Sequence, residues 1–255
     1  SFGDVLKEGP AEDPTNKERI TKILRFGSTK QADCLKQMTS VDSYIERMIE
    51  GQKDIYYLCS DSSANALGSP YLETFKSREI EVLLMSGRID EWLMSHLDSY
   101  KDHKFVNIGR DGLELPGEEK KDKSLSTKQE ATEHKELLER VKNVLGSKVS
   151  DVKLSIRLTT SAAVLVLNEN EMGPQMRQIM SAAGQSLPDE SPILEINPEH
   201  AMISALDKEI DDSKFSDLSH LIFDHAKLAS DGKLEDAPAY LSRVNSFLIS
   251  AFKDE

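Results

Sequence analysis

The chain has 255 residues, of which 30% are charged and 38% hydrophobic, and its net charge is −13. This is the composition of a globular protein that is long enough for one large domain or two ordinary ones. The acidic balance argues against a nucleic-acid groove or an anionic membrane surface as the main functional site, because phosphate groups are bound by concentrated Lys and Arg. No apolar run approaches the roughly 18 residues that would indicate a membrane span.

The cysteines and the N-terminus give further limits. Cys34 and Cys59 are too few for a disulfide framework, so a reducing compartment is expected. The first residues, SFGDVLKEGPAED, contain neither an initiator Met nor the pattern of a signal peptide. We therefore expect the chain to be a piece of a longer protein.

The first half of the chain alternates between patterns typical of helices and of strands. In chain order, the pattern predicts helices over 18–26 and 41–50, a strand over 53–60, an interrupted helical stretch over 62–78, a strand over 79–86, a short helix over 90–97 and a strand over 103–109. Ser40 is the expected N-cap of the second helix. Strand, helix and strand in succession predict parallel pairing, and hence an α/β fold with a small parallel αβα sandwich.

A dense polar stretch follows over residues 109–135. It contains glycines, a proline and the charged run EEKKDK, and it cannot bury enough apolar area to offset its ordering entropy. We interpret it as a linker with the domain boundary near residue 124. The predicted domains are therefore 1–123 and 124–255.

The second half predicts an α+β domain with a short sheet. An amphipathic helix is expected over 134–146 and should end at Gly146. Strands are predicted over 149–158, 162–168 and 191–196, with the first two forming a hairpin. Asn197 and Pro198 are the expected cap and first residue of a further helix.

Two amphipathic helices are predicted at the end of the chain, over 215–229 and 237–252, with a turn at Asp231–Gly232. Their apolar stripes follow the spacing of a helical bundle. The two helices either pack on their own sheet or supply half of an intermolecular four-helix bundle across a two-fold axis. The residues that would form the dimer contact are Phe215, Leu218, Leu221, Ile222, Leu228, Tyr240, Leu241, Val244, Leu248 and Phe252.

Common catalytic motifs are missing from the sequence. It contains no His-Glu-x-x-His, Cys-x-x-Cys, phosphate-binding loop, Gly-x-Gly-x-x-Gly or Gly-x-Ser-x-Gly, which argues against the usual nucleotide, zinc and serine-hydrolase sites. The polar loop after the first strand holds Asp61, which could help to bind an anion at a helix N-terminus or could merely cap the next helix. Neither a catalytic residue nor a metal ligand is assigned.

Two apolar features could belong either to the core or to a binding surface. Met172, Met176, Ile179 and Met180 share a helical face, and flexible Met side chains suit the binding of varied partners. A Met stripe is also typical of a core. Trp92, the single tryptophan, lies beside Asp90 and Glu91 and could be a recognition anchor or part of a core edge.

Several long blocks carry a specific resemblance. They are VLKEGPAEDPTNKERITKILRF, GQKDIYYLCSDS, SPYLETFKSREIEVLLMSGRIDEWLM, DVKLSIRLTTSAAVLV, EMGPQMRQIMSAAGQ and LEINPEHAMI. In this order they resemble the ninety-kilodalton heat-shock protein chaperones, and most closely the bacterial members. The resemblance covers nearly the whole chain.

The resemblance implies a chaperone piece without an enzyme site of its own. Residues 1–123 would be the C-terminal part of the middle domain, and residues 124–255 the C-terminal dimerisation domain. The ATP and magnesium of the family would bind upstream of Ser1, as would the middle-domain arginine that reaches ATP, so we expect no cofactor here.

The resemblance also implies partners and a client-binding site. Client proteins, meaning unfolded or partly folded proteins, would contact Met172, Met176, Ile179 and Met180 together with Glu91, Trp92 and Ser95. Met180 and Ser95 depart from the bacterial pattern, which usually has a bulkier aromatic residue and Asn. The terminal helices would form a homodimer, co-chaperones could be further partners, and a bacterial-type cytoplasmic protein is expected, with a mitochondrial relative as the alternative.

The sequence is therefore compatible with three hypotheses. The first is a homodimeric chaperone piece that binds clients through the Met-rich helix and the surface around Trp92. The second is an α/β ligand-binding domain that uses the loop at Asp61. The third is a purely structural dimerisation module in which the methionines are buried.

Overall fold

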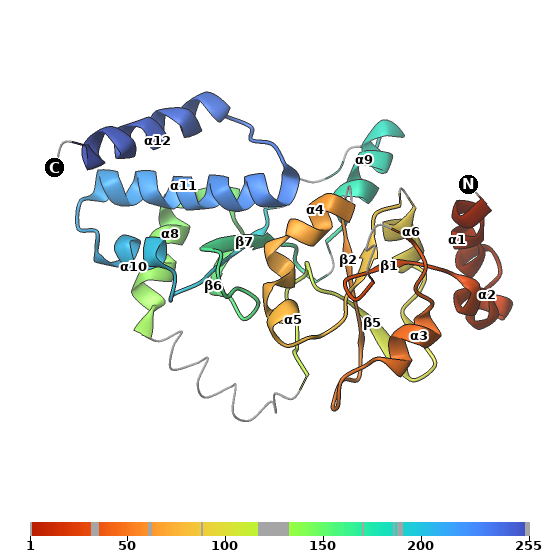
Figure 1. Cartoon of the computed structure of the whole chain (residues 1–255). Coiled ribbons are helices and arrows are strands. Elements are labelled where there is room, and N and C mark those ends of the chain that lie inside the picture. Colours follow the sequence, from red (N-terminus) through yellow and green to blue (C-terminus); the bar gives the residue numbers. More distant parts are fainter. Residues whose placement is uncertain are drawn as a thin grey trace. The chain divides into compact units, whose positions relative to one another are not determined.

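Two mixed β-sheets organise the chain, one in each of two units (Figure 1). The structure is a computed structural model that describes residues 2–31, 36–60, 63–87, 89–116, 133–169, 171–185, 187 and 191–252. The first unit comprises residues 1–119 and 167–189, and the second comprises 120–166 and 190–255. The domain limits predicted above remain a prediction. The units differ from them by grouping residues 167–189 with the first part of the chain.

The first unit contains a five-stranded sheet with the order β1-β3-β2-β5-β4. The strands are β1 (Gly27–Ser28), β2 (Ile55–Cys59), β3 (Leu83–Met85), β4 (Ser99–Tyr100) and β5 (His103–Asn107). The central strand β2 is parallel to β3 and to β5, as predicted. The edge strands β1 and β4 run antiparallel to their neighbours, so the sheet is mixed rather than wholly parallel.

Helices cover both faces of this sheet, because alternate residues of β2 point to opposite sides. Ile55 and Tyr57 pack with residues of the N-terminal helices, whereas Tyr56 meets Phe75 on the other face, with ring centroids 5.1 Å apart. The helices of this unit are α1 (Phe2–Glu12), α2 (Lys17–Ile23), α3 (Val41–Glu46), α4 (Ser63–Gly68), α5 (Glu73–Ser77), α6 (Asp90–Met94) and α9 (Pro174–Ala182), with short 3₁₀ turns at Pro14–Asn16 and Pro70–Leu72.

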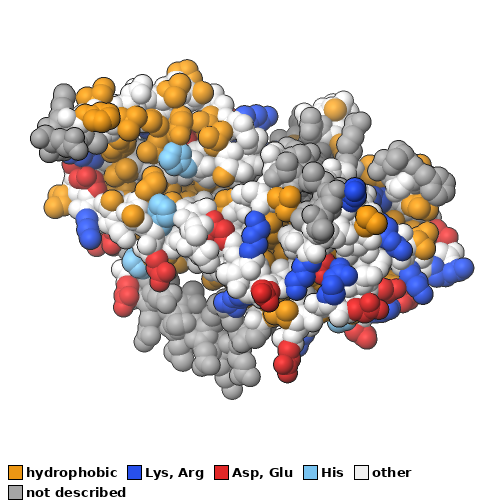
Figure 2. All heavy atoms as spheres, viewed as in Figure 1, with side chains coloured by type: hydrophobic (Ala, Val, Ile, Leu, Met, Phe, Trp, Pro, Cys, Tyr) orange, Lys and Arg blue, Asp and Glu red, His pale blue; other side chains and the backbone are white. Residues whose placement is uncertain are grey.

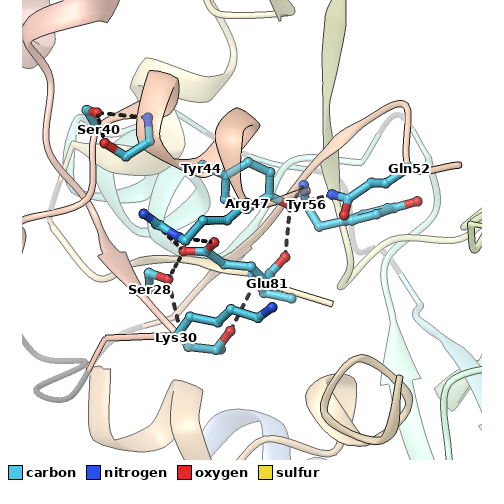
Figure 3. Close-up of polar contacts among 11 residues, drawn as sticks. Ser28, Lys30, Ser40, Tyr44, Arg47, Gln52, Tyr56 and Glu81 are labelled. Atoms are coloured by element: carbon cyan, nitrogen blue, oxygen red, sulfur yellow. Dashed lines mark hydrogen bonds and ion pairs between the residues drawn. The ribbon is translucent and has the colours of Figure 1, made fainter. Parts of the chain in front are cut away.

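A buried polar network fixes α3 against the sheet (Figure 3). The Tyr44 hydroxyl donates to the Glu81 carbonyl oxygen over 2.8 Å and accepts from the Gln52 amide and the Tyr56 backbone N–H, both at 2.9 Å. Burial raises the pKa of Tyr44, which keeps the hydroxyl protonated as the donor. The buried Glu81 carboxylate is paired with Arg47 over 2.7 Å. Each strongly polar group of the network therefore has a partner, as burial requires.

The second unit contains a three-stranded sheet with the order β6-β8-β7. Its strands are β6 (Asp151–Leu154), β7 (Ala163–Val166) and β8 (Ile193–Ile196). The predicted hairpin of the first two strands is wrong, because β8 lies between them, parallel to β6 and antiparallel to β7. A central position gives β8 backbone partners on both edges, and all four of its residues are buried.

Helices pack on this sheet through one apolar core. They are α8 (Lys135–Leu145), followed by a 3₁₀ turn at Gly146–Lys148, α10 (Ala201–Lys208) and α11 (Asp212–Asp231), whereas α12 (Ala237–Ala251) packs on α11. Leu137 and Val141 of α8 and Phe215 and Ile222 of α11 belong to this core together with Leu194 of β8. The α+β prediction for the second half is thus confirmed in its coarse form, as a short mixed sheet with helices.

Local signals placed several helix ends correctly. The Ser40 hydroxyl accepts from the Ser43 N–H over 3.1 Å, and Gly146 and Gly232 end their helices with positive φ angles of 55° and 68°. The predicted start at Asn197 is wrong. The helix begins three residues beyond Pro198, and the His200 ring nitrogen caps it by accepting from the Met202 N–H.

The predicted linker is also partly wrong at its start. Leu113 and Leu115 are buried, and Arg110 forms an isolated bridge with Leu167 within the first unit. These contacts extend the first unit to the end of the described segment at residue 116. The expected boundary near residue 124 lies outside the described residues.

Candidate functional site

The first turn of α6 is anchored to α1 by a buried ion pair. The Lys7 ammonium lies 2.6 Å from Asp90 Oδ1, and both side chains are at most 2% exposed. The other carboxylate oxygen of Asp90 accepts from the Gly87 N–H over 2.8 Å. A buried charge pair with an added hydrogen bond holds its geometry tightly, because either charge alone would be costly in that environment. These contacts therefore hold the start of α6 in place within the first unit.

Trp92, two residues further along α6, is half-buried rather than enclosed in the core. Its ring lies 4.7 Å from the His96 ring, centroid to centroid. Ser95 is exposed, and its hydroxyl donates to the Trp92 carbonyl oxygen over 2.7 Å. The Trp-bearing side of α6 thus keeps an aromatic surface that water reaches.

The Met-rich helix α9 lies against α6, although their contacting residues are 85 positions apart in the sequence. The Met176 N–H, in the first turn of α9, donates to the Glu91 carboxylate over 3.1 Å. Both helices belong to the first unit. The Trp-bearing helix and the Met-rich helix, which are far apart in the sequence, therefore meet in one place.

The methionine stripe is partly open. Met172, Met176 and Met180 are half-buried, and Ile179 is 46% exposed. None of these side chains is enclosed in the described cores, which disfavours the hypothesis that the methionines are buried. Together with Trp92 they give an adaptable apolar surface, since Met and Trp side chains can cover irregular partners.

The alternative ligand site gains no support from the described residues. Asp61 lies outside them, so the hypothesis of an anion site at this loop stays untested. Burial, followed by the carboxylates of Glu91 and Asp90, raises the pKa of the Cys59 thiol well above its usual range. A protonated thiol is a poor nucleophile. Within the described ranges, no group of three or more His, Cys, Asp or Glu side chains is placed to hold a metal ion.

A second apolar surface lies on the terminal helices. Figure 2 shows hydrophobic side chains gathered over α11 and α12. The exposed ones are Leu228, Leu241, Leu248, Ile249 and Phe252, and their exposed fractions run from 41% to 76%. Arg243 ties α12 to α11 through Asp224 over 3.1 Å, and His225 Nε2 lies 3.0 Å from the Tyr240 hydroxyl.

The ten residues predicted to form the dimer contact thus divide into groups. Phe215, Leu221 and Ile222 are buried within their own unit, so they have almost no surface to offer a partner. Leu218, Tyr240 and Val244 are half-buried. The exposed members are Leu228, Leu241, Leu248 and Phe252.

Comparison with known sequences agrees with the chaperone family that the sequence blocks resemble. The family model described as Hsp90 protein matches residues 1–254, and the chain therefore belongs to the Hsp90 family. The resemblance inferred from the sequence blocks is confirmed. In the described segments, no helix is both long and apolar enough to cross a bilayer.

Individual relatives are bacterial proteins named chaperone protein HtpG. The one from Shewanella amazonensis is 45% identical over 250 residues, which cover 98% of this chain and 39% of the relative. The one from Pseudoalteromonas translucida is 42% identical over 252 residues, which cover 99% of this chain and again 39% of the relative. The chain thus spans about two-fifths of the length of these curated relatives.

Sequence reasoning missed two residues that position this site. Lys7 lies in a segment to which no helix was assigned, and Gly173 precedes the Met-rich helix without a motif of its own. A lysine among apolar residues of a helix could have been recognised as a buried partner for a carboxylate. The role of Gly173 depends on a side chain from a distant helix, and no local pattern indicates it.

Proposed function

We propose that this chain belongs to a molecular chaperone and binds partly unfolded client proteins on the surface formed by α9 and α6. The observation that supports this most is that α9, which carries the partly exposed methionine stripe, contacts α6, which carries the half-buried Trp92. Soft, adaptable apolar side chains bind varied sequences, because they repack around different partners. The names of the bacterial relatives point the same way.

The test is the affinity for a destabilised basic protein that remains partly unfolded. Ile179→Ser removes an apolar side chain that is 46% exposed on α9. If a client buries the Ile179 side chain, the substitution removes up to about 1.5–3 kcal/mol of binding free energy. This corresponds to a roughly tenfold or greater rise in Kd. Ile210→Ser is the matched control, because Ile210 is 91% exposed in the other unit. Equal affinities of both variants and the unchanged chain would refute the proposal.

Charge should contribute to client selection. The net charge of −13 favours basic clients through long-range attraction, which salt screens within about 10 Å at 0.1 M ionic strength. We therefore expect the affinity for the basic client to fall as salt is added. An affinity that does not change with salt would remove charge steering from the proposed function and leave the apolar surface as its basis.

We further propose that the chain forms homodimers through α12 and the exposed end of α11. Leu241, Leu248 and Phe252 follow one helical stripe and are more than half exposed. Arg243 and Tyr240 of α12 already contact α11, through Asp224 and His225 respectively. Two copies in one dimer would offer two client surfaces, and the second contact of a client would then be favoured by its high local concentration.

A further inference from the structure

We infer that Glu91 is a positioning residue, whose carboxylate caps the N-terminus of α9 and holds the Met-rich helix beside Trp92. Gly173 provides the space for this carboxylate. The inference rests on the proposed function for its consequence in client binding, whereas the capping contact itself can be measured without any client.

Helix α9 has no side-chain cap of its own at its N-terminus. The first N–H groups of a helix need acceptors, which usually come from a Ser, Thr, Asp or Asn side chain at the N-cap. The N-cap residue of α9 is Gly173, no side chain caps it locally, and the first turn contains no acidic residue. The Glu91 carboxylate fills this role from another helix by accepting from the Met176 N–H over 3.1 Å. Its negative charge also suits the positive end of the helix dipole.

Gly173 leaves space for the Glu91 carboxylate. Its φ angle of −72° is one that any residue adopts, so the backbone does not require glycine there. A Cβ atom at this position would, however, overlap the Glu91 carboxylate. The residue is buried against that carboxylate. The absence of a side chain at Gly173 thus permits the cap, and an alanine would displace a flexible carboxylate rather than backbone.

Glu91 belongs to a helix turn that other contacts hold in place. Its neighbour Asp90 forms the buried ion pair with Lys7 and accepts from the Gly87 N–H. Consecutive residues of a helix point in different directions, so Asp90 reaches α1 while Glu91 reaches α9. A cap held in this way preorganises the methionine stripe next to Trp92, and preorganisation saves part of the entropy cost of binding a client.

The experiment compares Glu91→Ala, Gly173→Ala and the double variant, with hydrogen exchange at the Met176 amide as the first readout. A hydrogen bond to a charged group has a strength that corresponds to roughly a tenfold to hundredfold change in an equilibrium. We expect exchange at Met176 to accelerate by about this factor in each single variant, and little more in the double one. Glu91→Gln, which keeps an acceptor oxygen, should restore part of the protection.

The second readout is affinity for the destabilised basic protein. If Glu91 acts through α9, each single variant weakens client binding several-fold. The double variant then behaves like either single one, because both substitutions disrupt the same capping hydrogen bond. Glu18→Ala and Gly68→Ala are the matched controls. Glu18 lies in the first turn of α2, and a Cβ at Gly68 would meet nothing within 4 Å.

Three results would contradict, respectively, the capping contact, the positioning role of Glu91 and the proposed client surface. Unchanged exchange at Met176 in Glu91→Ala would overturn the cap itself. Independent, additive losses of affinity would overturn the positioning role, because they would mean that Glu91 touches the client directly. Faster exchange in both single variants, with client affinity unchanged in these and in Ile179→Ser, would confirm the cap and overturn the proposed client surface.

Discussion

Arg157 and Glu195 form a buried ion pair in the second unit. The guanidinium meets the carboxylate through two nitrogens, Nε at 2.8 Å and Nη2 at 2.7 Å, and both side chains are at most 5% exposed. The Ser155 hydroxyl donates to the same carboxylate over 2.8 Å. The pair connects β8 with the segment after β6, and thus helps to hold the central strand in register.

Removing one member of this pair should destabilise the second unit strongly. Glu195→Leu removes the carboxylate that pairs with the buried Arg157 charge, so we expect the free energy of unfolding to fall by about 3–5 kcal/mol. The double variant Arg157→Met/Glu195→Leu should recover much of this loss, since both charges of the pair are then replaced by apolar side chains. Denaturant unfolding followed by circular dichroism measures both effects.

The exposed pair Lys142–Asp151 provides the comparison for this prediction. Its atoms are 2.9 Å apart, but its side chains are 47% and 43% exposed. Lys142→Ala should cost only about 0–1 kcal/mol, because water screens the pair. A Glu195→Leu variant that lost no more than Lys142→Ala would contradict the role given to the buried pair.

The helices show which parts of the fold are predictable from local sequence. Ser40, Gly146 and Gly232 mark helix ends through their own side-chain or backbone chemistry, and these positions were predicted correctly. Helix α1 was not predicted, since Gly9 and Pro10 weaken its pattern. Contacts with α2 and α6, which no local pattern shows, support it.

Most features that could not be predicted from the sequence depend on contacts between distant segments. The position of β8 between β6 and β7 depends on contacts across about 40 residues. The same holds for the candidate site. Residue type indicated the Met stripe and Trp92, and the family resemblance grouped them, but only the fold shows that Glu91 caps α9. Non-local contacts of this kind leave no periodic signal in the sequence.

The packing of α12 on α11 should depend on pH through two histidines. Burial is the main cause that lowers the pKa of His225, which faces Tyr240 and lies near Asp224. Burial and then Lys148 and Arg243 lower the pKa of His220, against smaller opposing effects of Asp224 and Asp217. Each ring is therefore easier to protonate in the unfolded chain than in the folded one.

The sign of the effect follows from this difference. The folded-state pKa of each histidine lies below the ordinary value of 6.5. The contribution of the two neutral histidines to the free energy of unfolding is therefore complete above pH 6.5, and it is lost as the pH falls through the folded-state pKa. We expect the urea midpoint to decrease between about pH 7.5 and 5.5, a range above the usual titration of carboxylates. The variant His220→Gln/His225→Gln should flatten this dependence. An unchanged slope in the double variant would contradict the assignment.

The exposed stripe of α12 leads to a prediction about the whole molecule. Leu241, Leu248 and Phe252 are 51–76% exposed in the single chain, and each would contribute up to about 1.5–3 kcal/mol if a second copy buried it. We therefore expect the chain to sediment as a dimer at micromolar concentration, and the variant Leu241→Ser/Leu248→Ser to sediment as a monomer with unchanged helix content. Ile210→Ser, which alters an exposed residue outside both helices, should stay dimeric.

A deletion test should remove only α12, because Phe215 and Ile222 of α11 belong to the core and their loss would unfold the second unit. A chain that sediments as a monomer before any substitution would refute the proposed dimer.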